Sequence, residues 1–364
     1  MISPEDIEKL VRPEIKAMPP YVPIQPINVL VRRLEISETE VIKLDGNENP
    51  YGCSPRVKHA LADYAYYHIY PDPEQRELRK ELEKYTGVSV KNILAGSGSD
   101  ELIDLILRLF LKPGDRVVNC PPTFGMYPFS TDVCGGKVVS IPRKPDFSID
   151  VARSFKAISG GARVIFIASP NNPSGNITPE TAILELLKAK AVVVVDEAYY
   201  EFSGVTMAPQ VNKYPNLIVL RTFSKWAGLA GLRVGYGIFP ANMVEYLMKI
   251  KQPYNVNAAA QLAALESLGD LDYLRGTIKV ILKERQRLME KLGQLDWLKV
   301  YPSQSNFILC RVLKGNATAI HKELQKQGIF IRYFDTPQLR DCLRISVGKP
   351  EHTDKLIAAL KRKR

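Results

Sequence analysis

The sequence predicts an α/β fold with a mainly parallel sheet. Short apolar runs recur through the middle of the chain without polar–apolar alternation, at Val117-Val118 and at residues 164–167, 192–195 and 218–220. Such runs are typical of strands that helices cover on both faces. A Gly-Ser-Gly-Ser turn at residues 96–99 opens an apolar helical segment that stops at Lys112-Pro113-Gly114. After Pro253 the pattern changes to long helical segments, which indicates a second, smaller α+β unit.

The chain has 364 residues, more than one hydrophobic core usually holds, so we expect two domains. The smaller domain has candidate strands at residues 306–312 and 343–347. Residues 1 to about 40 are expected to contain a helical start and then, because the four prolines of residues 18–26 preclude a continuous helix, an extended arm. We therefore predict an N-terminal arm that joins the small domain (residues 1–40), a large domain (41–253) and a small domain (254–364).

Composition and charge exclude several classes of protein. The formal net charge is +11, but basic and acidic residues alternate in segments such as 76–84, which indicates a solvated helix face and not a nucleic-acid surface. No apolar run reaches the length of a membrane span, and the N-terminus lacks a signal-peptide core. The five cysteines form no CxxC pair and the four histidines are dispersed, so we expect no metal site. We expect a soluble cytoplasmic protein.

The segment Thr222-Phe223-Ser224-Lys225, followed by Arg233, carries the strongest functional signal. It combines an amine with hydroxyl groups and a guanidinium directly after an apolar strand. Ligands of open α/β sheets bind at that edge. Pyridoxal phosphate needs a lysine for its aldehyde and hydrogen-bond donors and an arginine for its phosphate. The alternative is an ordinary loop lysine.

Other strand ends carry residues that suit the same ligand. Asp196 follows the run 192–195 and can pair with a pyridine nitrogen, although Asp is also a common helix N-cap. Asn172 lies in a turn-like Asn-Pro-Ser-Gly segment and, with Tyr199, can donate hydrogen bonds to the cofactor's 3-oxygen. Phe124 follows another strand and can stack on the ring or simply pack. Exposed amides at a helix start, as at residues 98–101, bind phosphate.

Together these segments resemble the fold-type I pyridoxal-phosphate-dependent aminotransferases. The resemblance rests on Asn172-Pro173-Ser174-Gly175, Asp196-Glu197-Ala198-Tyr199 and Ser224-Lys225 through Arg233. A narrower resemblance, to the histidinol-phosphate aminotransferase subfamily, rests on the segments 44–50, 70–73, 98–101, 122–127 and 343–348. The resemblance implies a seven-stranded sheet between helices in the large domain, pyridoxal 5'-phosphate as cofactor and a homodimer.

The resemblance also implies a role for each site residue. Lys225 would bind the cofactor aldehyde as a Schiff base and move a proton, Asp196 would pair with the pyridine nitrogen, and Tyr199 would act with them. The other implied cofactor contacts are Phe124 at the ring, Asn172 at the 3-oxygen, and Ser99, Asp100, Glu101, Thr222, Ser224, Arg233 and the partner subunit's Tyr70 at the phosphate. The implied substrate contacts are Tyr21, Asn47, Arg332 and Arg344. Many relatives carry tyrosine in place of Phe124 and a smaller residue in place of Trp226.

The implied reaction is amino transfer between histidinol phosphate and 2-oxoglutarate, giving imidazole-acetol phosphate and glutamate, as in histidine biosynthesis. Aromatic amino-acid aminotransferases and threonine-phosphate decarboxylases share the fold and most of the motifs, so both stay open as alternatives. A regulator fused to a DNA-binding domain is disfavoured because the aminotransferase pattern begins by Leu44. A non-catalytic relative is disfavoured because Lys225 and Asp196 are both present.

Overall fold

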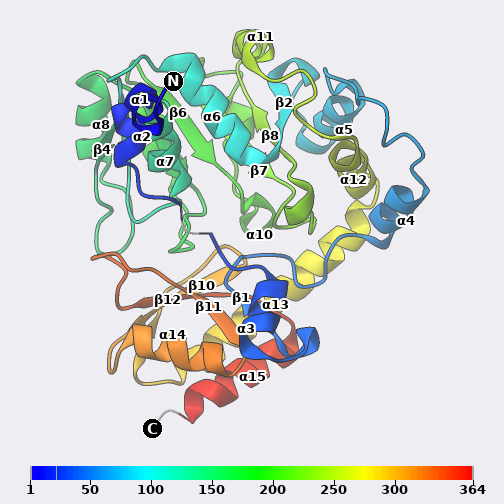
Figure 1. Ribbon diagram of the computed structural model, residues 1–364, viewed down its shortest axis with the longest axis vertical. Helices are drawn as coiled ribbons and strands as arrows, with labels where there is room; N and C mark the ends of the chain where they lie inside the picture. The colour runs from blue at the N-terminus through cyan, green and yellow to red at the C-terminus, as the bar shows by residue number, and fades with distance from the viewer. Residues whose placement is uncertain (1, 22, 363–364) are drawn as a thin grey trace.

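The computed structural model describes residues 2–21 and 23–362, which form two sheets with helices packed around them (Figure 1). The α-helices are α1 (Pro4–Leu10), α2 (Pro13–Ala17), α3 (Ile27–Leu34), α4 (Pro55–Asp63), α5 (Arg76–Thr86), α6 (Gly98–Phe110), α7 (Met126–Val133), α8 (Val151–Ser159), α9 (Glu180–Leu186), α10 (Tyr200–Ser203), α11 (Ala241–Ile250), α12 (Ala258–Leu268), α13 (Leu271–Gly293), α14 (Ala317–Lys326) and α15 (Pro350–Lys361). Short 3₁₀ turns are η1 (Glu38–Glu40), η2 (Val90–Asn92), η3 (Ala208–Gln210) and η4 (Ala230–Leu232).

The larger sheet has seven strands in the order β2-β8-β7-β6-β5-β3-β4. Its strands are β2 (Ile93–Gly96), β3 (Arg116–Asn119), β4 (Lys137–Ser140), β5 (Ala162–Ala168), β6 (Val192–Asp196), β7 (Leu217–Thr222) and β8 (Gly235–Ile238). Strand β8 runs opposite to the other six strands of this sheet, so it pairs antiparallel with both β2 and β7. The predicted mainly parallel, seven-stranded sheet is therefore confirmed. The reversed strand was not foreseen, because its Gly-Tyr-Gly-Ile sequence carries no apolar run.

Helices cover both faces of this sheet, which explains why its strands read as continuous apolar runs. Every residue of β6 is buried. Val193 and Val195 face a core shared with α4, α5, α8, α9 and α12, whereas Val192 and Val194 face α6, α7 and α11. Apolar burial on both faces removes the alternation that a half-exposed strand would show.

The smaller sheet has five strands in the order β1-β11-β12-β10-β9. They are β1 (Ile42–Leu44), β9 (Leu298–Val300), β10 (Phe307–Val312), β11 (Ile329–Tyr333) and β12 (Cys342–Ser346). One face packs on α14, α15 and the C-terminal part of α13. On β12 that face carries Leu343 and Ile345, so Arg344 and Ser346 point to the opposite face by the two-residue period of a strand.

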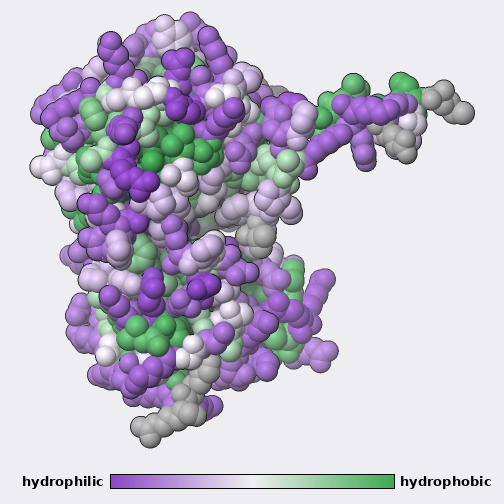
Figure 2. Space-filling view, turned by 90° about the vertical axis from the view of Figure 1, so that its left-hand side faces the viewer, coloured by the Kyte–Doolittle hydropathy of each residue, from purple (hydrophilic) through white to green (hydrophobic). Residues whose placement is uncertain are grey.

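Helix α13 connects the two sheets. The 23-residue helix α13 contributes Leu274 and Ile278 to the core of the larger sheet and Leu288 and Leu292 to that of the smaller one (Figure 1). At the N-terminus α2 packs on α7, and α1 stands away from the body (Figure 2). The strand β1 at residues 42–44 pairs with β11 in the smaller sheet.

The predicted domain boundaries near residues 41 and 254 stay a prediction. Within the described residues, none of the helices combines the length and the hydropathy that a bilayer crossing requires.

Candidate active site

A cavity of about 860 Å³ lies between the carboxyl ends of the parallel strands and the polar face of the smaller sheet. The strands β5, β6 and β7 end at its wall, as expected for a ligand site in an open α/β sheet. The predicted site residues that line it are Tyr21, Asn47, Ser99, Asp100, Phe124, Asn172, Asp196, Tyr199, Thr222, Ser224, Lys225, Arg233, Arg332 and Arg344. Segments far apart in the sequence thus meet around one cavity.

Lys225 lies at the wall of this cavity, three residues after β7 ends. Its Nζ donates a hydrogen bond to the carbonyl oxygen of Gly46 at 3.1 Å. Desolvation by burial, assisted by the positive charge of Arg344, lowers the pKa of Lys225 to about 8. The amine is therefore neutral, and nucleophilic, at a much lower pH than that of an exposed lysine.

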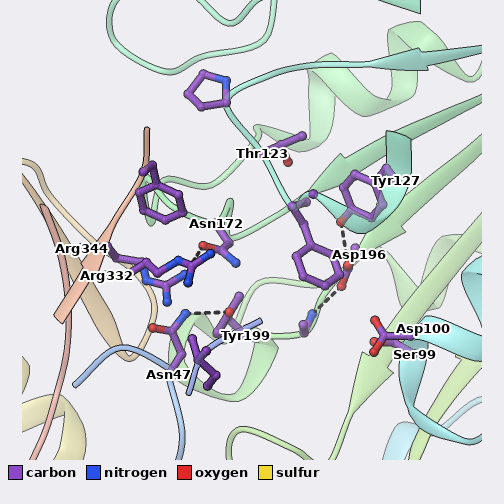
Figure 3. A pocket seen from close by; sticks show the side chains of 18 of the residues that line it. Asn47, Ser99, Asp100, Thr123, Tyr127, Asn172, Asp196, Tyr199, Arg332 and Arg344 are labelled. Carbon is purple, nitrogen blue, oxygen red and sulfur yellow. Dashed lines mark hydrogen bonds between the residues drawn. The ribbon is translucent and has the colours of Figure 1, made fainter. Parts of the chain in front are cut away.

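Asp196, the last residue of β6, is buried and accepts two hydrogen bonds. Tyr127 donates its hydroxyl to Asp196 Oδ2 at 2.6 Å, and the backbone N–H of Ala198 donates to Oδ1 at 3.0 Å (Figure 3). Burial raises the pKa of Asp196 to about 6, while the bond from Tyr127 acts in the opposite direction. Helix α10 begins at Tyr200 and its N-cap is Tyr199, so Asp196 does not cap that helix. The carboxylate is left to face the cavity.

The two side chains predicted to bind a cofactor's 3-oxygen are held by groups from outside the larger sheet. Arg344 Nη1 donates to Asn172 Oδ1 at 2.6 Å, and Asn47 Nδ2 donates to the Tyr199 hydroxyl at 2.9 Å (Figure 3). Burial raises the pKa of Tyr199, against the opposing effects of Arg344 and Asn47. The Tyr199 hydroxyl therefore stays protonated near neutral pH and can act as a donor.

Ser99 and Asp100, at the start of α6, lie at one end of the cavity, and Arg332 and Arg344 lie at the opposite end (Figure 3). Arg233 Nη2 donates to Asp100 Oδ2 at 2.6 Å. A Cβ on Gly98 would lie 2.6 Å from Arg233 Nη2, and Gly98 has a φ of +75°. Only glycine therefore lets this guanidinium approach the helix start so closely. Backbone amides and a guanidinium together make an anion-binding end.

Two predicted residues do not line the cavity. The Glu101 carboxylate turns away and accepts hydrogen bonds from Ser97 N at 2.5 Å and Asn255 Nδ2 at 2.8 Å. Tyr70 is 77% exposed and stacks on Tyr254 with ring centroids 4.4 Å apart. The phosphate contacts of the Glu101 amide and of the partner subunit's Tyr70 stay predictions.

The structure adds lining residues that the sequence analysis did not single out. Tyr127 is one; it follows Phe124 by three residues, so a helical register at the start of α7 would have brought both rings to the same side. Phe334 is another, after β11, and the guanidiniums of both Arg332 and Arg344 lie over its ring. No local pattern indicates Phe334, because its position depends on the pairing of two strands.

The chain matches the family model for class I and II aminotransferases over residues 39–360. Among curated proteins it is 53% identical to the histidinol-phosphate aminotransferase of Dehalococcoides mccartyi strain BAV1, over 88% of this chain and 90% of that protein. It is 48% identical to the enzyme of the same name from Roseiflexus castenholzii, covering 98% of this chain and 99% of that one. Among solved structures it is similar to histidinol-phosphate aminotransferase from Sinorhizobium meliloti in complex with pyridoxal-5'-phosphate, with a TM-score of 0.88, 29% identity and 97% coverage of both chains.

Proposed function

The chain belongs to the class I and II aminotransferases, and we propose that it transfers an amino group between histidinol phosphate and 2-oxoglutarate with pyridoxal 5'-phosphate as cofactor. The products are imidazole-acetol phosphate and glutamate, as in histidine biosynthesis. The names of the relatives at 53% and 48% identity support this choice of substrate. The structural observation that carries it is the pair of guanidiniums, Arg332 and Arg344, at the end of the cavity opposite the anion-binding helix start.

The residues that line the cavity fit pyridoxal phosphate. The helix start at Ser99, with Arg233 beside it and the Thr222 and Ser224 hydroxyls nearby, suits the phosphate group. A Cβ on Gly235 would lie 2.7 Å from Ser99 N, so glycine at this position lets β8 pass close to the helix start. Asp196 suits the pyridine nitrogen, and Lys225 suits the aldehyde carbon. When bound, the cofactor supplies an electron-accepting ring that stabilises negative charge on the substrate's α-carbon.

The side chains around the cofactor ring have separate roles. Lys225 Nζ, whose pKa is lowered to about 8, moves the proton at the substrate's α-carbon. Asp196 keeps the pyridine nitrogen protonated, and Tyr127 holds the carboxylate in place. Asn172 and Tyr199 hydrogen-bond the 3-oxygen, and Phe124 packs against the ring face.

Substrate recognition uses the other end of the cavity. Arg344 binds the α-carboxylate of glutamate, and Arg332 binds the phosphate of histidinol phosphate together with Tyr21 from the N-terminal arm. Asn47 borders the same space. Two separate guanidiniums serve one pocket, because one half-reaction brings a dicarboxylate and the other a phosphate ester.

A substrate panel tests the proposal. The purified protein is loaded with pyridoxal phosphate and assayed with histidinol phosphate, phenylalanine, tyrosine and threonine phosphate, each with and without 2-oxoglutarate. We expect histidinol phosphate to give the highest kcat/KM and to require the keto acid. Faster turnover of the aromatic amino acids would favour an aromatic aminotransferase, and release of carbon dioxide from threonine phosphate without a keto acid would favour a decarboxylase.

The proposal includes a homodimer with two shared active sites. Apolar and aromatic side chains are exposed on two surface segments, Ile7 and Leu10 on α1 and Tyr66, Tyr67 and Tyr70 after α4. Exposed apolar groups of this kind are expected where a partner covers them. Tyr70 then reaches the phosphate end of the partner's cavity.

A cytoplasmic location and the domain division are also part of the proposal. The five cysteines are free thiols, which suits a reducing compartment. The large domain at residues 41–253 holds the cofactor, and the small domain at 254–364, joined by the arm at 1–40, supplies Arg332 and Arg344. Strand β1 would then belong to the small-domain sheet despite its position at residues 42–44.

A further inference from the structure

Strand β12 carries two polar side chains, Arg344 and Ser346, on the face opposite the small-sheet core, and only Arg344 lines the cavity and has a role in the proposed function. Ser346 is two residues further along the same face and is 3% exposed. Its hydroxyl contacts Asn47, which is 299 residues earlier in the chain. This contact connects the smaller sheet to the loop after β1.

Three hydrogen bonds hold Asn47 in one orientation. Its backbone N–H donates to Ser346 Oγ at 2.9 Å, and Ser346 Oγ donates to Asn47 Oδ1 at 2.8 Å. Asn306 Nδ2 donates to the carbonyl oxygen of Asn47 at 2.9 Å. Asn47 has a φ of +54°, a left-handed conformation that asparagine tolerates better than most residues. The backbone and the side chain of Asn47 are therefore both held by Ser346 of β12 and by Asn306, which directly precedes β10.

The direction of these bonds determines which group Asn47 offers to the cavity. Ser346 Oγ accepts the backbone N–H, so its own proton is available for Asn47 Oδ1. With Oδ1 engaged there, Nδ2 is the atom turned to Tyr199, and it donates to the hydroxyl at 2.9 Å (Figure 3). A hydroxyl that accepts on one side keeps its proton for another acceptor. The Tyr199 proton is thus available to a group inside the cavity.

We propose that Ser346 is a positioning residue that acts through Asn47 to aim the Tyr199 hydroxyl, as a donor, at the 3-oxygen of the cofactor. The inference rests on the proposed function, because it takes pyridoxal phosphate as the ligand. It gives Asn47 a second task beside the substrate contact. The Tyr199 ring is buried and lies edge-on against Phe307 at 5.0 Å, so the hydroxyl has little freedom to find another partner.

The test follows the visible absorption of bound pyridoxal phosphate as a function of pH. A donor to the 3-oxygen stabilises its negative charge, so a weaker donor makes the bound cofactor hold its proton to higher pH. We expect Ser346→Ala to raise the midpoint of the absorption change by up to about 1 pH unit, the effect of one neutral hydrogen bond. Asn47→Gly, which suits the left-handed backbone and removes the amide, should shift the midpoint in the same direction.

The matched control is Ser305→Ala. Ser305 is fully buried, and its hydroxyl forms no hydrogen bond with the described residues. The substitution removes a buried hydroxyl without touching Asn47, so the midpoint should stay at the wild-type value. Ser346→Thr, which keeps the hydroxyl, should return the midpoint toward that value.

A double-mutant cycle shows whether Ser346 acts through Tyr199. In the Tyr199→Phe background, Ser346→Ala should add no further shift, since the group it orients is gone. An equal shift in both backgrounds would overturn the inference, as would an unchanged midpoint in both Ser346→Ala and Asn47→Gly with cofactor bound. If Ser346→Ala does not fold, the same cycle is run with Asn47→Gly, and its effect on the midpoint is compared in the wild-type and Tyr199→Phe backgrounds. If the variants show these shifts but the wild-type protein, with cofactor bound, catalyses no transamination, the proposed function is refuted and the positioning role still stands.

Discussion

Arg332 on β11 and Arg344 on β12 are directly opposite each other across two antiparallel strands. Both guanidiniums pack over the ring of Phe334, at 5.5 and 5.6 Å from its centroid. Like charges that face each other across a sheet are destabilising. Burial also lowers the pKa of Arg344 to about 10. We propose that this pair binds the anionic groups of the substrates, and the first prediction follows from this proposal.

Arg344→Ala should reduce kcat/KM for glutamate by roughly 100-fold or more, since it removes charge-assisted hydrogen bonds of about 1.5–3 kcal/mol each. Arg332→Ala should mainly affect histidinol phosphate. Half-reaction rates measured with each substrate separate the two. Arg340→Ala is the control, because Arg340 is an exposed arginine in the segment between β11 and β12 and does not line the cavity. Equal, small effects of both substitutions on every substrate would contradict this pocket.

Asp196→Asn should retain the cofactor but lose turnover by several orders of magnitude. An amide cannot keep the pyridine nitrogen protonated, so the ring loses its capacity to accept electrons. Bound cofactor is measured by absorbance after gel filtration and turnover by a coupled glutamate assay. Near-normal turnover in Asp196→Asn would instead show that the carboxylate only accepts the hydrogen bonds from Tyr127 and Ala198 and has no role at the pyridine nitrogen.

Tyr127→Phe should weaken cofactor binding by roughly 10- to 100-fold, since the hydroxyl donates to a buried carboxylate and such bonds are worth about 1.5–3 kcal/mol. The tyrosine bond opposes the effect of burial on Asp196, so its loss raises the pKa of that carboxyl further. Equilibrium dialysis of pyridoxal phosphate gives the affinity. Wild-type affinity in Tyr127→Phe would show that the bond does not support the site.

Cofactor uptake by the apoprotein should report the lowered pKa of Lys225. Only the neutral amine attacks an aldehyde, so the rate should rise with pH and level off above about pH 8, not continue toward the ordinary value of about 10.5. Stopped-flow absorbance measures the rate, and borohydride reduction with peptide mapping identifies the labelled lysine. Label on another lysine would refute the assignment. Lys225→Ala is the control that should give no label.

Mixing variants tests the shared site. Tyr70→Ala and Lys225→Ala subunits should each be nearly inactive alone. If Tyr70 acts on the partner's site, their heterodimers contain one site with both residues intact, and activity recovers on subunit exchange. A mixture with confirmed heterodimers that stays as inactive as its parents would place Tyr70 in the site of its own chain.

The sequence identified much of the fold and the site because their signals are local. Unbroken apolar runs predicted the strands β3, β5, β6 and β7, because a strand that is buried on both faces has apolar residues at successive positions. The residues at the ends of these strands or just after them were predicted to meet a ligand, and Asn172, Asp196 and Lys225 do line one cavity. The carboxyl ends of parallel strands lie at one edge of a sheet, so the position of these residues at the ends of their strands was enough to predict that they meet.

Only the tertiary structure decided the contacts that depend on register, direction and rotamer. The reversal of β8, the turning of the Glu101 side chain toward Asn255 and the bond from Tyr127 to Asp196 have no signature within one segment. Ser346 reaches Asn47 across 299 residues because β12 places it on the same face as Arg344. A strand's side chains change face with each residue, so a shift of one position in pairing would turn both away from the cavity. That pairing is set by the packing of the whole sheet.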